Sequence, residues 1–171
     1  MKNIFSLLCV LLSCSFSFGQ ETSLTDTEVA SVAVVANQID IDYAKLALEK
    51  SKNQEILDFA QRMIEDHEAV IAQAVALVTK LGVQPKDNAV SQSLLEGAEK
   101  TKRQLKKSSK KKFDKAYIDN EVAYHKAVIG AVKNLLIPET ENAELKDFLG
   151  AVLPALETHL GHAEMVQKNI Q

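Results

Sequence analysis

The sequence contains no tryptophan, and its two cysteines, Cys9 and Cys14, both lie within the first nineteen residues. Those residues have the features of a leader that is cleaved off, so the mature chain would hold no thiol. A chain without cysteine forms no disulfide, and it offers no thiolate to a metal that prefers sulfur ligands. The apolar residues after Thr25 show no alternation of period two, so no strand is predicted. Abundant alanine, leucine, glutamate and lysine favour helix instead.

An excess of positive charge is also absent: 20 Lys and Arg face 23 Asp and Glu, which gives a formal net charge of −3. This balance excludes a nucleic-acid-binding protein that relies on overall positive charge. Basic residues do gather between Lys100 and Lys115, where eight lysines and one arginine occur. No interleaved series of aromatic residues accompanies them for bases to stack on. Two interpretations are open: a solvated loop at the end of a bundle, or a contact with anionic lipid or polysaccharide of the cell envelope.

The first nineteen residues predict export. Lys2 supplies the positive charge, residues 4–12 form an apolar run too short to span a bilayer, and residues 17–19 offer a small-x-small cleavage site. We therefore expect a signal peptide over residues 1–19, a single domain over residues 20–171 and a place in the periplasm. Residues 11–14 also resemble a bacterial lipobox, so a lipid anchor at Cys14 and association with the outer membrane is the alternative.

Helical periodicity organises the rest of the chain. Thr25 and Glu28 form a capping box, Asn53 is a helix cap, and Gly82 followed by Pro85 is a helix stop. Four long helices joined by two short links and one longer crossover predict an all-α, ferritin-like, up-down four-helix bundle with an extra short helix in the crossover. The expected long helices span about residues 25–51, 53–82, 112–136 and 141–167, and the extra helix spans about residues 89–105.

The most regular apolar pattern runs over residues 56–81 and holds the letters RMIEDH at positions 62–67. His67 lies on the apolar face of this helix, where a buried imidazole needs a polar partner. The inward rows of two other helices supply Asp40, Glu121 and His125. Counted from the predicted turns, these three side chains and His67 fall within a layer about 8 Å deep.

His159 also lies on an inward row, but the same count places it about 12 Å lower than His125. It would join the layer only through the kink expected at Pro154, or through stagger or tilt of its helix. Pairing with Tyr117 or Asp119 in its own layer is the alternative.

A buried set of imidazoles and carboxylates suits zinc, iron or manganese. The Glu-x-x-His pairs of ferritin-like di-iron enzymes do not occur in the sequence, which counts against ferroxidase or oxygenase chemistry. The candidate metal ligands are Asp40, His67, Glu121, His125 and His159. A core of histidines that only hydrogen-bond to acidic and tyrosine partners is the alternative.

Four segments carry a more specific signal: residues 62–67 (RMIEDH), 113–117 (FDKAY), 121–125 (EVAYH) and 153–160 (LPALETHL). In this order they resemble the motifs of the bacterial domain-of-unknown-function 4142 family, and the resemblance covers about residues 25–167. It implies an exported bacterial protein with a ferritin-like bundle and no settled activity. The family's histidines correspond to His67, His125 and His159, and its acidic pair to Asp40 and Asp42, each shorter than usual by one methylene.

Three functions fit these observations. The first is an exported ferritin-like protein that binds a divalent metal in envelope metal handling or oxidative stress. The second is a structural or interaction bundle with no metal and no catalysis, and the third is a hydrolase or oxidase that uses the cluster. Each of these three functions is compatible with self-association into a homo-oligomer.

Overall fold

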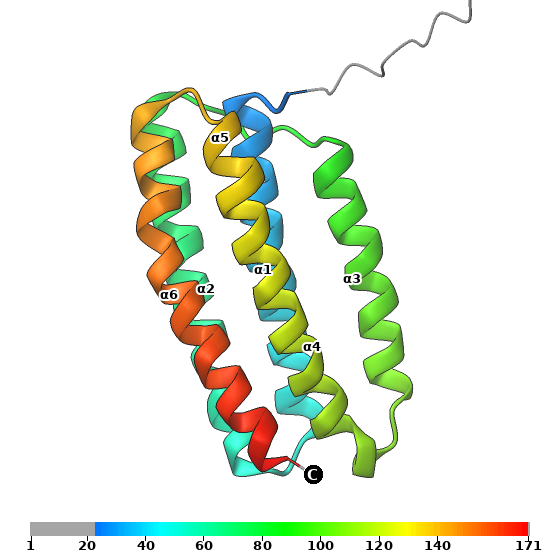
Figure 1. The fold of residues 1–171 in the computed structure, drawn as a ribbon. Helices are drawn as coiled ribbons and strands as arrows, with labels where there is room; N and C mark the ends of the chain where they lie inside the picture. The colour runs from blue at the N-terminus through cyan, green and yellow to red at the C-terminus, as the bar shows by residue number, and fades with distance from the viewer. Residues whose placement is uncertain (1–22, 171) are drawn as a thin grey trace, which may run out of the picture.

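The computed structural model describes residues 23–170, so the leader, Cys9 and Cys14 lie outside the described residues. The described part is helical and contains no strand, as predicted. No helix in this part is both long and apolar enough to cross a membrane. The elements, drawn in Figure 1, are α1 (Asp26–Lys50), α2 (Gln54–Leu81), α3 (Ala89–Lys107), α4 (Lys110–Ala131), the π-helix η1 (Val132–Leu136), α5 (Ile137–Glu139) and α6 (Ala143–Asn169).

Two helical hairpins make up the bundle. The first is α1 with α2 and the second is α4 with α6, and the hairpins contact each other through α2 with α6 and through α1 with α4. The crossover between α2 and α4 holds α3, which packs mainly along α1 (Figure 1). This arrangement confirms the predicted all-α bundle with a crossover helix.

Local signals set the helix ends. The backbone N–H of Thr25 donates to the Glu28 carboxylate at 3.0 Å, which is the predicted capping box. The Asn53 side chain accepts the N–H of Glu55 at 2.9 Å, so it caps α2 as predicted. Gly82 ends α2 with φ of 66°, a conformation that favours glycine.

The basic stretch between Lys100 and Lys115 is not a loop. It comprises the last turns of α3 and the first turns of α4, joined at Ser108 and Ser109. The Lys50 ammonium donates to the carbonyl oxygens of Leu105 and Lys106, at 3.0 and 2.6 Å, and so holds the end of α3 against α1. These hydrogen bonds satisfy carbonyl groups that have no partner within the helix at the end of α3. Contact with an envelope surface stays a prediction.

The second hairpin turns later in the chain than the sequence predicts. Pro138 does not end the helix: α4 continues through η1 and α5, and the turn falls at residues 140–142. The Thr140 hydroxyl donates to the Leu136 carbonyl at 2.6 Å. The Asp26 carboxylate accepts the N–H groups of Glu141 and Asn142, at 2.9 and 3.1 Å, which fixes this turn against the start of α1.

The hydrophobic core has two parts. One cluster includes Phe59, Tyr117 and Ile118, and the other includes Leu136 and Leu149. On each of the four bundle helices, a buried polar side chain lies near the junction of the two clusters. That polar layer is where the candidate site lies.

Candidate metal centre

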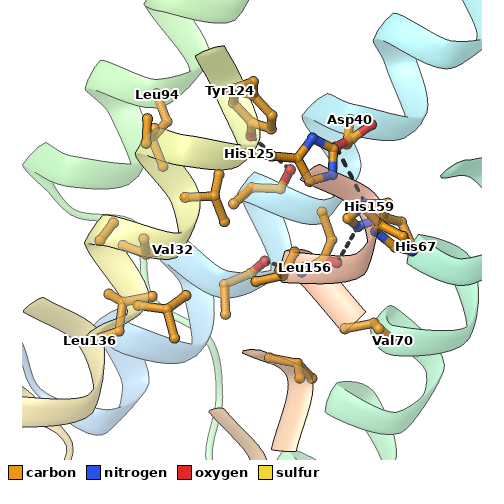
Figure 2. Close-up of a pocket in the computed structure, with 18 of the residues that line it drawn as sticks. Val32, Asp40, His67, Val70, Leu94, Tyr124, His125, Leu136, Leu156 and His159 are labelled. Carbon is orange, nitrogen blue, oxygen red and sulfur yellow. Dashed lines mark hydrogen bonds and ion pairs between the residues drawn. The ribbon is translucent and has the colours of Figure 1, made fainter. Parts of the chain in front are cut away.

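Three imidazole rings meet in the polar layer, each from a different helix. His67 comes from α2, His125 from α4 and His159 from α6, and Asp40 of α1 lies beside them (Figure 2). The ring centroids are 5.9 Å apart for His67 and His125, 5.2 Å for His67 and His159, and 5.6 Å for His125 and His159. These four residues are at most 5% exposed.

The tautomer of His67 follows from its surroundings. Its Nδ1 lies 2.7 Å from the side-chain oxygen of Asn37. The amide nitrogen of Asn37 donates to the Ala33 carbonyl at 2.8 Å, so the amide oxygen must be the atom that faces His67. Nδ1 of His67 therefore carries a hydrogen, and in a neutral ring the lone pair would be on Nε2, 3.3 Å from Asp40 Oδ2.

The other two histidines are fixed in the same way. Nδ1 of His125 donates to the backbone carbonyl of Glu121 at 3.0 Å, and its Nε2 lies 3.4 Å from Asp40 Oδ2. Nε2 of His159 donates to Asp66 at 2.9 Å, so its Nδ1 holds the lone pair. Each ring thus donates to an acceptor outside the cluster and directs its lone pair inward.

The inward atoms have no hydrogen-bonding partner among residues 23–170. They are Nε2 of His67, Nε2 of His125, Nδ1 of His159 and both carboxylate oxygens of Asp40. One ligand atom from each histidine can be chosen so that all three lie within 4.8 Å of one another. Neutral rings and a carboxylate offer only lone pairs to one another, and a proton or a metal ion between them would satisfy these lone pairs.

The pKa directions favour neutral rings at His125 and His159 beside an ionised Asp40 carboxylate. Burial lowers the pKa of His125 and that of His159 below the ordinary 6.5. Burial alone would raise the pKa of Asp40, but the neighbouring imidazoles, His67 first, bring it below the ordinary 3.8. Binding of a metal ion would require all three rings in the neutral form and the carboxylate ionised.

Glu121 lies next to this group and has a different character. It is fully buried, and burial together with the charge of Asp40 raises its pKa well above 4.5. Glu121, Asp40 and His125 form a second set whose ligand atoms lie within 4.8 Å. The Glu121 carboxyl is, however, 3.8 Å from Nδ1 of His125, the nitrogen that already donates a hydrogen bond. The three histidines therefore make the better candidate set, and Asp40 Oδ2 lies 3.3 Å from Nε2 of His67 and 3.4 Å from Nε2 of His125.

Comparison with known proteins gives the family. The sequence profile of one family, described as a domain of unknown function (DUF4142), matches residues 15–166. The chain belongs to DUF4142. No curated protein sequence matches it. Among solved structures, "CopM in the Cu(II)-bound form" resembles this DUF4142 chain with a TM-score of 0.64 and 17% identity, over 86% of this chain and 100% of that one. At this identity the likeness shows the fold.

The structure brings all five predicted residues of the DUF4142 chain together. Asp40, His67, Glu121 and His125 share one layer, as their axial positions predict. The expected offset of His159 is wrong, because its ring lies 5.6 Å from that of His125. The hairpin turns at residues 140–142, so the two histidines stand sixteen residues before and eighteen residues after Glu141, at nearly equal height.

His159 also has a different partner from the ones expected. It bonds to Asp66 of α2, whereas Asp119 accepts hydrogen bonds from Lys115 and Gln167. Sequence reasoning missed the supporting roles of Asn37 and Asp66. Asp66 lies inside the RMIEDH motif, so its place beside His67 was a usable signal. Asn37 gave no signal beyond its position one turn before Asp40 and Ile41.

Two further residues of this DUF4142 chain lie outside the cluster. Asp42, the second member of the acidic pair, bonds to Lys102 at 3.0 Å and to Gln38 at 3.1 Å. The ring of His162 packs edge-on against Phe59, with 5.1 Å between centroids. Neither side chain belongs to either candidate ligand set.

Proposed function

We propose that this chain binds one divalent transition-metal ion between His67, His125 and His159, with Asp40 as the fourth ligand. The observation that carries the proposal is the fixed direction of the three rings. Histidines that ligate metals almost always donate their other N–H to an outer acceptor, which orients the ring and raises its basicity. Here an amide oxygen, a backbone carbonyl and a carboxylate serve as those acceptors.

The ligand set favours zinc or copper(II). Three imidazoles and one carboxylate give a four-coordinate nitrogen and oxygen site, which suits either ion better than manganese or iron(II). CopM, whose structure is that of a Cu(II)-bound form, supports the inclusion of copper. We propose metal handling, meaning uptake and release of the ion, as the role of the site.

We further propose that this role is performed outside the cytoplasm, because the first nineteen residues have the order of a signal peptide. Mass spectrometry of the protein from its native envelope should find Gln20 at the N-terminus. A diacylglyceryl group on Cys14 would instead support the lipid-anchored form, and an intact Met1 would exclude export by either route.

Thermal unfolding tests the metal site. Protein purified without a histidine tag and stripped with a chelator should be stabilised by Zn²⁺ or Cu²⁺ by about 2.7 kcal/mol when the free ion is at 100 times Kd. The variant His67→Ala should lose this gain. His162→Ala makes the same substitution at a histidine outside the cluster and should keep it.

The alternative function predicts a different result. If the histidines form only a hydrogen-bonded core, His67→Ala should destabilise the metal-free protein and added ions should leave the wild-type melting temperature unchanged. Elemental analysis of the stripped and reloaded protein gives the stoichiometry. A value well below one ion per chain, with no stabilisation, would reject the proposed site.

A further inference from the structure

A cavity of about 390 Å³ adjoins the metal centre (Figure 2). Side chains from α1, α2, α3, α4, η1 and α6 line it. Figure 2 shows Leu136 and Val32 at one end of the cavity and the three histidines at the other. The cavity therefore reaches from the aliphatic core to the polar layer.

The two ends of the cavity differ in chemistry. The end away from the histidines is lined by aliphatic side chains of the second hydrophobic cluster, among them Val32, Leu136 and Leu149. The other end carries the histidine rings and Asp40. An apolar cavity with a few polar groups at one end is typical of sites that bind small amphiphilic molecules.

Helix α3 covers one side of this space. Leu94 and Ala98 of α3 line the cavity, but α3 packs mainly on α1 and contacts α4 little. Gly97 of α3 and Ala123 and Ala127 of α4 also line the cavity and are exposed. The cavity therefore opens to solvent between α3 and α4, with these small residues at its mouth.

We infer that the cavity binds a molecule with one unbranched aliphatic chain and a terminal carboxylate, with the chain along the aliphatic end and the carboxylate at the histidines. An engineered cavity of about 150 Å³ holds a six-carbon ring, or about 25 Å³ per carbon. A cavity of about 390 Å³ thus suits a chain of about ten to fifteen carbons.

The charge of the end group follows from the metal centre. A divalent ion beside the Asp40 carboxylate leaves a net positive charge in a buried site, and an anionic group compensates it. This part of the inference rests on the proposed function, whereas the chain-binding part rests on the cavity alone. By linkage, the carboxylate ligand and the metal ion should each strengthen the binding of the other.

Calorimetric titration tests both parts. Decanoate, octanoate, 1-decanol and 1-octanol are each titrated, the two carboxylates below their micelle concentrations, into the zinc-loaded protein and into the metal-free protein. Each buried methylene should strengthen binding about fourfold, so the ten-carbon member of each pair should bind about 15-fold more tightly than the eight-carbon member. Zinc should strengthen the binding of decanoate and leave that of 1-decanol nearly unchanged.

A matched pair of variants locates the site. Val128→Phe places a ring in the cavity and should weaken 1-decanol binding at least tenfold. Val75→Phe makes the same change at a half-exposed position of α2 that does not line the cavity, and binding should stay as in the wild type. If Val128→Phe does not melt cooperatively, Ala98→Leu fills the cavity from the side of α3 instead.

The outcomes separate the two proposals. Absence of alkanol binding, equal affinity for the eight- and ten-carbon members, or wild-type binding by both filling variants would overturn the inference. Decanoate binding that zinc does not strengthen would overturn the carboxylate assignment. If the protein takes up no metal and still binds 1-decanol with the predicted chain dependence, the proposed function fails and the chain site stands.

Discussion

Replacement of Glu121 by glutamine should stabilise the metal-free protein at pH 7. Glu121 is fully buried, and within the described residues neither of its carboxylate oxygens has a hydrogen-bonding partner. Burial first, and then the charge of Asp40, raise its pKa well above 4.5, so the folded protein favours the protonated form. Glutamine has the same shape, is neutral at every pH, and offers an N–H to the Asp40 carboxylate.

The magnitude follows from proton linkage. The unfolded chain releases this proton near the ordinary pKa of 4.5, and the raised pKa of the folded protein opposes its release, so the cost at pH 7 is bounded by the 2.5 pH units between 4.5 and 7. At about 1.36 kcal/mol per unit the cost is at most about 3.4 kcal/mol. Because part of this cost remains as desolvation of the amide, we expect Glu121→Gln to gain about 1–3 kcal/mol, or several degrees in Tm.

The sign of the pH dependence is fixed by the direction of the shift. A pKa that is higher in the folded protein makes Glu121 most favourable below pH 4.5, and this contribution is lost as the pH rises toward the folded value. The advantage of Glu121→Gln should therefore grow between pH 4.5 and pH 7. Urea denaturation followed by far-ultraviolet circular dichroism measures it at both pH values.

The exposed Glu68 of α2 provides the control, since Glu68→Gln should change stability little at either pH. A loss of stability in Glu121→Gln at pH 7, or an equal gain at both pH values, would refute the reasoning. The variant also tests the choice of ligands. Because Glu121 faces the protonated nitrogen of His125, metal should stabilise Glu121→Gln as much as the wild type.

Two further predictions concern the supporting residues and the backbone. Asp66→Asn removes the carboxylate that orients His159, and it should weaken zinc binding about 10- to 100-fold, measured in competition with a chelating dye. Asp58→Asn, an exposed change on the same helix, should leave zinc binding unchanged. Gly82→Ala should destabilise the protein by about 1–2 kcal/mol in urea denaturation, because φ at this position is 66°. Gly161→Ala lies inside α6 with open space around the added methyl, so it should stabilise the protein by up to about 1 kcal/mol.

The fold was predictable because its signals are local. The caps at Thr25 and Asn53 and the stop at Gly82 act within one helical turn, so sequence spacing is enough to place them. The inner row of α1 was also predictable: Val29, Val32, Ala36, Ile39, Tyr43 and Leu46 are all buried. Short connections then leave few ways to arrange the helices.

The completed site was less predictable because it depends on distances across the bundle. The helix continues through a π-helical segment past Pro138, and the turn falls a few residues later than expected. This shifts His159 along the bundle axis, relative to His125, by about two helical turns. Sequence periodicity does not report such a change, since the apolar spacing continues through η1. The ring tautomers also depend on contacts with Asn37 and Asp66, which follow from side-chain packing and have no periodic pattern.

The position of the cluster argues for a ligand rather than for packing. The polar layer lies within a largely apolar core, and each of the four bundle helices contributes one side chain to the cluster of Asp40, His67, His125 and His159. Replacing buried ionisable groups by apolar side chains of similar volume is often neutral or stabilising, so a bundle that only had to pack gains nothing from this layer. A bound metal ion, as proposed, would change that balance, because it would compensate the inward lone pairs and link Asp40 and His67 of one hairpin to His125 and His159 of the other. The stabilisation by metal should therefore appear in global unfolding of the bundle and not in the local opening of a single helix.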